Sequence, residues 1–133
     1  MNVVEIGLYN ALSGYSALTT ALGSATAIWN GVATQGTALP YVVVTHAGGG
    51  LMNLTPSEMH DLVYMVQALA DDSAEASTLQ GHIKGALHNQ TLTVTGYTNI
   101  DTQCEGEINY VETTREGALI HHRGYYVRIR IDN

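Results

Sequence analysis

The 133-residue sequence is short of cysteine and of long apolar runs, and each shortage excludes a class of protein. Cys104 is the single cysteine, so no disulfide can form within the chain, and nothing indicates an oxidising compartment. No run approaches the roughly 18 apolar residues of a membrane-spanning helix. The N-terminus also lacks the positive charge and the apolar run of a signal peptide. We therefore expect no membrane association, and folding in a cytoplasm.

Basic residues are equally scarce. Five lysines and arginines stand against 12 aspartates and glutamates, which gives a formal net charge of −7. Binding to nucleic acid through its phosphates depends on clustered lysine and arginine, so the sequence does not predict a nucleic-acid-binding protein. The first 57 residues contain no lysine or arginine and a single carboxylate, Glu5. This neutral segment is expected to form core, a contact surface, or both.

Motifs for metal binding are missing too. A zinc site needs three or four convergent ligands, and the six histidines form no H-E-x-x-H pattern. His121 and His122 are adjacent, so they should point to opposite faces of a strand. His46 and His60 flank a glycine-rich segment and would meet only if that segment forms a hairpin, which leaves a metal site as a minor alternative. We expect no metal and no cofactor.

Candidate catalytic side chains have simpler explanations. Glu105 and Glu107 lie two residues apart and would share one face of a strand, but a solvated face accounts for them better than a general acid–base pair. Cys104 has no cationic neighbour in sequence and is interpreted as a small, half-buried hydrophobic residue. The glycines at 48–50 are not followed by the Lys-Ser/Thr of a phosphate-binding loop. The sequence therefore predicts no enzyme.

Apolar periodicity and turn residues predict an α+β fold in one domain that spans residues 1–133. Helices are expected at 2–12 and 16–22, strands at 27–29, 41–46 and 61–70, a long helix at 71–89, and strands at 91–97, 106–114 and 119–131. The economical packing is an antiparallel (or mixed) sheet with one long helix packed on a face and a short helical N-terminus.

The long helix and the last strand carry the strongest signals. Asp72 and Glu75 form a capping box, an apolar stripe follows at helical spacing, and Asn89 suits a left-handed helix end. Along the last strand, apolar side chains alternate with polar ones. One face is expected to carry Tyr125, Val127, Ile129 and Ile131, and the other Tyr126, Arg128, Arg130 and Asp132.

Two candidate contact surfaces emerge from this pattern. Residues 47–56 hold three consecutive glycines and should form a mobile loop, on which Leu51, Met52 and Leu54 need a partner to cover them. Tyr126, Arg128 and Arg130 form a small strip on one strand face that suits the rim of a subunit contact. Alternatively, the arginines simply pair with glutamates of a neighbouring strand, Glu107 and Glu112.

The chain resembles the tail-terminator, or tail-completion, proteins of long-tailed phages. The resemblance rests on residues 12–18 (LSGYSAL), on Leu22-Gly23 and on residues 27–44 (AIWNGVATQGTALPYVVV). The strand-to-helix segment around Asp71 to Leu87 and a long last strand with basic residues are also similar. The likeness spans almost the whole chain, and its motifs are structural rather than chemical.

This resemblance implies a structural virion protein without catalytic residues. Such proteins form a ring, usually a hexamer, that caps the tail tube and joins it to the head connector or stopper, while double-stranded DNA passes through without specific binding. The implied location is the tail or neck of the virion, after assembly in the host cytoplasm. Two alternatives remain: a head-completion or neck protein of the same machinery, and a small-molecule binding domain or enzyme built around His46, His60 and a carboxylate.

Overall fold

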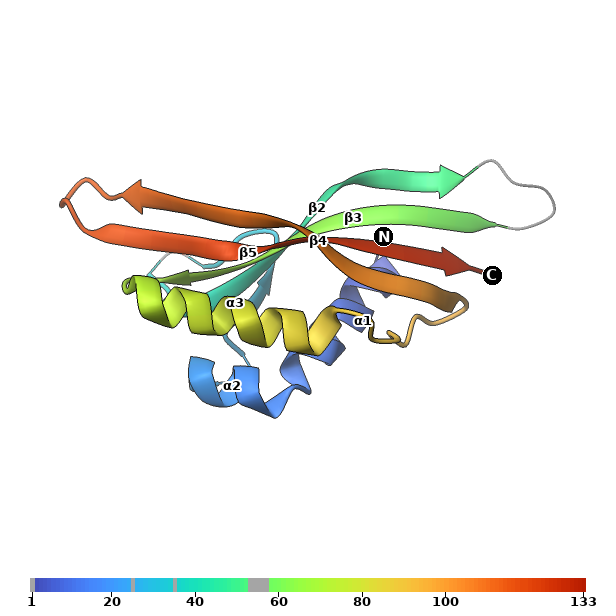
Figure 1. The fold of residues 1–133 in the computed structure, drawn as a ribbon, viewed down its shortest axis with the longest axis horizontal. Helices are drawn as coiled ribbons and strands as arrows, with labels where there is room; N and C mark the ends of the chain where they lie inside the picture. The colour runs from blue at the N-terminus through green and yellow to red at the C-terminus, as the bar shows by residue number, and fades with distance from the viewer. Residues whose placement is uncertain (1, 25, 35, 53–57) are drawn as a thin grey trace.

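The computed structural model describes residues 2–24, 26–34, 36–52 and 58–133, which form a five-stranded sheet with helices on one face (Figure 1). The elements follow the chain in the order α1 (Asn2–Ser13), α2 (Ser16–Leu22), β1 (Ile28–Asn30), β2 (Tyr41–Met52), β3 (Met59–Ala70), α3 (Ser73–Leu87), β4 (Thr98–Thr113) and β5 (Leu119–Asp132).

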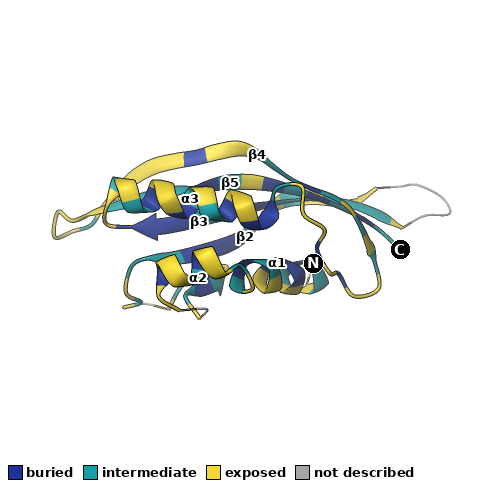
Figure 2. Cartoon of the chain, turned by 60° about the horizontal axis from the view of Figure 1, so that its bottom comes forward, coloured by how far each residue is buried: buried dark blue, intermediate teal, exposed yellow. Residues whose placement is uncertain are grey.

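The sheet is mixed, with the strand order β1-β2-β3-β5-β4. β1 runs parallel to β2, and every other neighbouring pair is antiparallel. The three helices formed by the described residues lie on the same side of the sheet (Figures 1 and 2), so none of them covers the opposite side, called here the open face. The predicted α+β class is confirmed, and so is the mixed sheet.

The core lies between the helices and the sheet. Alternate side chains of β3 and β5 point toward the helices and are buried: Leu62, Tyr64, Val66, Ala68, Val127, Ile129 and Ile131. The helices meet them with Val4, Leu8, Leu12, Leu79, Ile83 and Leu87. The predicted alternation along the last strand is therefore confirmed, because only one of its faces is covered.

The ends of α3 form as the sequence predicts. The Asp72 carboxylate accepts a hydrogen bond from the Glu75 backbone N–H at 3.4 Å, which satisfies one of the free donors at the helix start. Asn89 follows the helix with a φ of 58°, the left-handed conformation that asparagine tolerates. Its own N–H donates to the Thr102 carbonyl at 2.9 Å, so the end of the helix is tied to β4.

One prediction about the elements is not confirmed, and another is wrong. α1 has 12 residues and α3 has 15, so a single long helix on the face is not confirmed. Residues 91–97 form a single bridge, Val94 to Tyr97, instead of a strand. The Leu92 N–H donates to the Asn99 side chain at 2.9 Å, and Leu92 and Val94 are buried in the core. Strand propensity is misleading here because Leu92 and Val94 pack into the core and do not pair with a neighbouring strand.

The glycine-rich segment is also not the predicted loop. β2 continues to Met52 and pairs with β3 as far as Met59, across a bulge between His46 and Gly48. Gly49 has a φ of 80°, and a Cβ there would overlap the Asp61 carbonyl oxygen. The glycine is required by a close approach of two strands rather than by mobility. The end of the predicted loop, including Leu54, lies outside the described residues.

Two hairpins extend beyond the helices at opposite ends of the molecule (Figure 1). We call residues 48–52 and 58–62 the β2–β3 arm, and residues 109–121 the β4–β5 arm. The side chains of the β4–β5 arm are largely exposed, as the yellow end of β4 shows in Figure 2, whereas those of the β2–β3 arm range from exposed at Leu51 to buried at Leu62. Among the described helices, none is long and apolar enough to cross a membrane.

Candidate subunit-contact surfaces

The predicted strip of Tyr126, Arg128 and Arg130 lies on the open face. β5 places it there because its alternate residues, Val127 and Ile129, are fully buried against the helices. Tyr126 is 39% exposed, and both arginine side chains are partly exposed. The strip is thus accessible to another protein.

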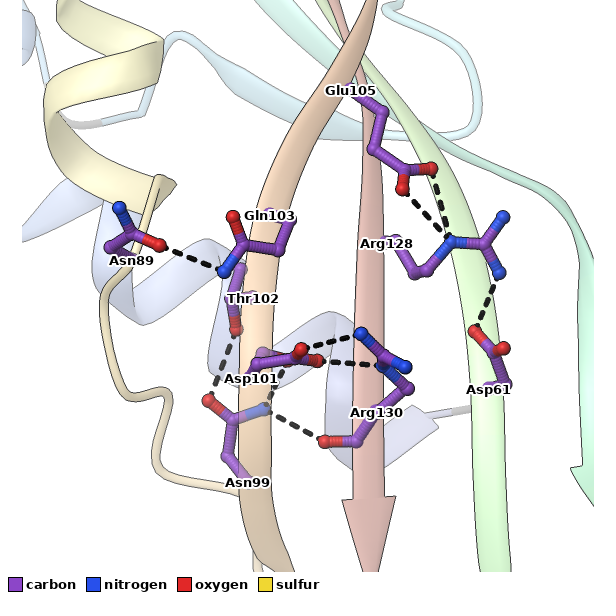
Figure 3. Close-up of polar contacts among 9 residues, drawn as sticks. All are labelled: Asp61, Asn89, Asn99, Asp101, Thr102, Gln103, Glu105, Arg128 and Arg130. Atoms are coloured by element: carbon purple, nitrogen blue, oxygen red, sulfur yellow. Dashed lines mark hydrogen bonds and ion pairs between the residues drawn. The ribbon is translucent and has the colours of Figure 1, made fainter.

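Both arginines are held by carboxylates of the neighbouring strands (Figure 3). The Arg128 Nη1 donates to Asp61 at 2.8 Å, and its Nε donates to both oxygens of Glu105 at 3.0 and 3.1 Å. Arg130 makes a two-pronged contact with Asp101 at 2.9 and 2.6 Å. This fork-to-carboxylate geometry fixes the orientation of the guanidinium groups.

These contacts remove the basic character of the strip. Hydrogen bonds to Asp61, and to a smaller extent to Glu105, raise the pKa of Arg128. The hydrogen bond to Asp101 raises the pKa of Arg130. Both arginines therefore stay charged. Three carboxylates against two guanidinium groups leave the cluster with one net negative charge. The surface is therefore suited to a protein contact and not to phosphates.

The arginines do pair with neighbouring strands, but not with the predicted glutamates. β4 has a bulge between Cys104 and Glu107, and this bulge moves Glu105 to the open face and Glu107 to the helix face beside Tyr125. Glu112 contacts the His122 Nε2 at 2.8 Å. The prediction that Glu105 and Glu107 share a face is wrong, because the extra residue shifts the alternation.

Asn99 supports this region through a network that the sequence did not reveal (Figure 3). Its amide oxygen accepts from the Leu92 N–H and from the Thr102 hydroxyl at 2.9 and 3.0 Å. Its amide nitrogen donates to the carbonyls of Asp101 and Arg130 at 3.1 and 3.2 Å. Every polar group of the side chain is satisfied, so Asn99 holds a bulge of β4 against β5 and the preceding connection.

Each arm exposes apolar side chains. On the β2–β3 arm, Leu51 is 56% exposed and Met52 is 36% exposed, so both side chains are accessible to another protein. On the β4–β5 arm, Tyr110, Val111 and Leu119 are each about half exposed. Sequence reasoning missed the second arm, although apolar residues on both sides of a tight turn were the available signal.

A groove between α1 and β1 forms another apolar surface. Its volume is about 320 Å³, and its walls are Asn2, Glu5, Ile6, Tyr9, Ile28, Trp29 and Asn30. Ile6 is 50% exposed and Tyr9 is 41% exposed. This groove lies in the neutral first part of the chain, where the sequence predicts core or contact surface.

The histidines do not converge. His46 pairs with Tyr64 across the hairpin, whereas His60 pairs with Leu51, so the two histidines are several residues apart along the arm. His46 stacks on Tyr64 with ring centroids 4.8 Å apart, and His122 stacks on Tyr110 at 4.2 Å. Within the described part of the chain, no group of three or more histidine, cysteine or acidic residues could hold a metal ion.

Cys104 has the environment of an unreactive thiol. It is partly buried against the core, and burial raises its pKa to about 11, although Lys84 opposes the shift. At neutral pH the side chain is a thiol and not the nucleophilic thiolate. This agrees with the interpretation of Cys104 as a small hydrophobic residue.

Comparison with known families gives a match over nearly the whole chain. Residues 7–130 match the family described as Tail completion protein gp17. The chain belongs to this family. A search of curated protein sequences gave no significant match. Members of the tail completion family are structural virion proteins and not enzymes, so the protein is a phage tail component located in the virion. The resemblance seen in the sequence is confirmed.

Solved structures share the fold of this tail completion protein. A chain described as "Virion of native gene transfer agent (GTA) particle" matches with a TM-score of 0.72 at 14% identity, covering 95% of this chain and 92% of that one. A second solved chain matches with a TM-score of 0.57 at 13% identity, covering 98% and 93%. At these identities the similarity establishes a common fold.

Proposed function

We propose that the protein assembles into a ring, as a hexamer, that caps the tail tube and joins the tail to the head connector. The proposal rests on the exposed apolar arms at the two ends of the sheet. Apolar surface of this kind on a small domain is costly unless a partner covers it. Two different surfaces, at opposite ends, suit contacts that continue from one subunit to the next and close into a ring.

The β2–β3 arm and the arginine strip are the proposed contacts with the tube or with a neighbouring subunit. Leu51 and Met52 supply the apolar part, and the predicted residue Leu54 belongs to the same proposal. Tyr126, Arg128 and Arg130 supply a polar rim whose ion pairs are already formed within the subunit. A rim of this kind gives orientation without a large cost of desolvation.

Double-stranded DNA is proposed to pass through the ring without being bound. The net charge of −7 opposes binding to phosphates, and Arg128 and Arg130, the arginines of the strip, are neutralised by carboxylates. A wall of this charge lets DNA slide and does not hold it.

The ring is tested by particle mass in solution over a range of concentrations, followed by electron microscopy of the purified protein and of isolated tails. We expect a closed ring with a central hole wide enough for duplex DNA, at the head-proximal end of the tail. Virions that form with normal head–tail joining when the gene is deleted would contradict the proposal. A ring found on the head portal and absent from free tails would favour a head-completion position.

The arm contact is tested by Leu51→Asp, which places a charge on an exposed apolar site without disturbing the core. The variant should fold, but it should fail to complete tails. Val32→Asp is the matched control, because Val32 is 83% exposed in the loop that follows β1 and is not part of the arm. Equal assembly by the two variants would show that the β2–β3 arm is not a contact.

A further inference from the structure

Two uncovered apolar surfaces lie at opposite edges of the sheet. The α1–β1 groove borders β1, and the β4–β5 arm includes β4, the other edge strand. β2, β3 and β5 lie between them, so the edges are separated by four strand spacings, or about 19 Å. Neither surface can cover the other within one subunit.

The groove presents apolar side chains on a fixed helix. α1 buries Val4, Leu8 and Leu12, and this places Ile6 and Tyr9 on its outward side, one turn apart. Trp29 of β1 lines the opposite wall. A rigid helix and a strand hold these side chains in place, so little conformational freedom is lost when a partner binds.

The backbone of β1 also offers unused hydrogen-bonding groups. The Val42 N–H donates to the Ala27 carbonyl, and the Gly31 N–H donates to the Val44 carbonyl. Because backbone groups alternate in direction along a strand, those of Ile28 and Asn30 point away from β2. An open edge of this kind accepts another extended segment.

The β4–β5 arm is an extended segment with the matching chemistry. Val111 is 50% exposed and Leu119 is 49% exposed, and the pairing register places both on the helix side of the sheet. α3 does not reach them, because its N-terminal two turns contact Arg123 through Ser73 and Ser77. The tip of the arm carries Arg115, which is exposed and forms no ion pair with the described residues.

We infer that the β4–β5 arm of one subunit packs into the α1–β1 groove of the next subunit. Val111 and Leu119 cover Ile6 and Tyr9, and Arg115 meets Glu5. Glu5 is the single carboxylate of the first 57 residues and lies on the wall of the groove. The contact is head-to-tail, since the two surfaces differ, and it rests on the proposed ring because such contacts repeat until they close.

Disulfide cross-linking tests the contact directly. In a Cys104→Ala background, Tyr9→Cys and Leu119→Cys are prepared as separate variants and mixed, both as purified protein and in assembling tails. We expect a disulfide-linked dimer in the mixture and not in either variant alone. The double variant Tyr9→Cys/Leu119→Cys should give a ladder of oligomers. Leu51→Cys mixed with Tyr9→Cys is the control for the other arm.

Charge reversal provides a second, independent readout. Glu5→Arg and Arg115→Glu should each raise the concentration needed for assembly about tenfold, and the double variant should restore it to near the starting value. Trp29 is the sole tryptophan and lines the groove, so its fluorescence should change on assembly of the native chain and of the double variant. Circular dichroism confirms that each variant is folded.

The outcomes separate this contact from the proposed ring. Rings that form without the Tyr9–Leu119 cross-link, or a double charge variant that stays as defective as the single ones, would overturn the contact and leave the ring intact. A cross-link from Tyr9→Cys to Leu51→Cys would assign the groove to the β2–β3 arm instead. Subunits that stay monomeric both in solution and on tails would overturn both proposals.

Discussion

Replacement of Gly49 by alanine should open the β2–β3 arm. Gly49 has a φ of 80°, and in this left-handed region a side chain costs about 1–2 kcal/mol. The new Cβ would also overlap the Asp61 carbonyl oxygen, so the two strands would have to separate. We expect Gly49→Ala to lower the local free energy of opening by about 2 kcal/mol or more.

Gly50 gives a matched control one residue away. A Cβ at Gly50 has no atom within 4 Å, and its φ lies outside the left-handed region. Gly50→Ala should therefore be neutral, or should stabilise the arm by a few tenths of a kcal/mol, because it reduces the freedom of the unfolded chain. The two variants have the same composition, so any difference comes from the fold.

Amide hydrogen exchange measures this difference where it arises. Residues 59–63 of β3 pair with the glycine segment of β2. Their protection should fall about 30-fold in Gly49→Ala relative to Gly50→Ala, which is what 2 kcal/mol corresponds to. Equal protection in the two variants would refute the strand assignment, and it would restore the mobile loop that the glycines suggest in the sequence.

Three other predictions concern the thiol, the helix cap and DNA. Between about pH 9 and pH 11, the unfolded chain releases the Cys104 proton while the folded chain keeps it. The free energy of unfolding should therefore fall as pH rises through this window. Urea titrations of Cys104→Ala should show a smaller fall. Asp72→Ala should lower the free energy of unfolding, measured in urea, by about 1 kcal/mol because α3 loses its cap. Asp71→Ala removes no capping bond, so it should lower this free energy by less than half as much. The assembled ring should show no retention of duplex DNA in a mobility-shift assay at physiological salt, and tight, salt-sensitive binding would contradict the proposed passage of DNA.

Local patterns predicted the helices and the last strand well. α3 has an N-cap at Asp72 and an apolar stripe within one segment, and both act through neighbours in sequence. Likewise, β5 alternates between a covered face and an open one, so its period of two survives in the fold. These signals need no knowledge of distant contacts.

Two β-bulges determine features of the fold that the sequence pattern did not predict. The bulge in β4 separates Glu105 from Glu107 and gives Arg128 its partner, and the bulge in β2 lets three glycines continue a strand. An extra residue inverts the alternation only when a specific strand lies alongside, so it leaves no period in the sequence. The same holds for the α1–β1 groove, whose walls come from separate elements.

The family and the absence of catalytic motifs could be predicted from the amino-acid sequence alone, because both depend on which residues are present and in what order. Pairing partners and uncovered surfaces were settled by tertiary structure. Arg128 and Arg130 could be seen as surface residues, but only the strand order β3-β5-β4 places Asp61, Glu105 and Asp101 beside them. Exposure of Val111 and Leu119 likewise depends on where α3 begins, and that is a property of packing between elements distant in the chain.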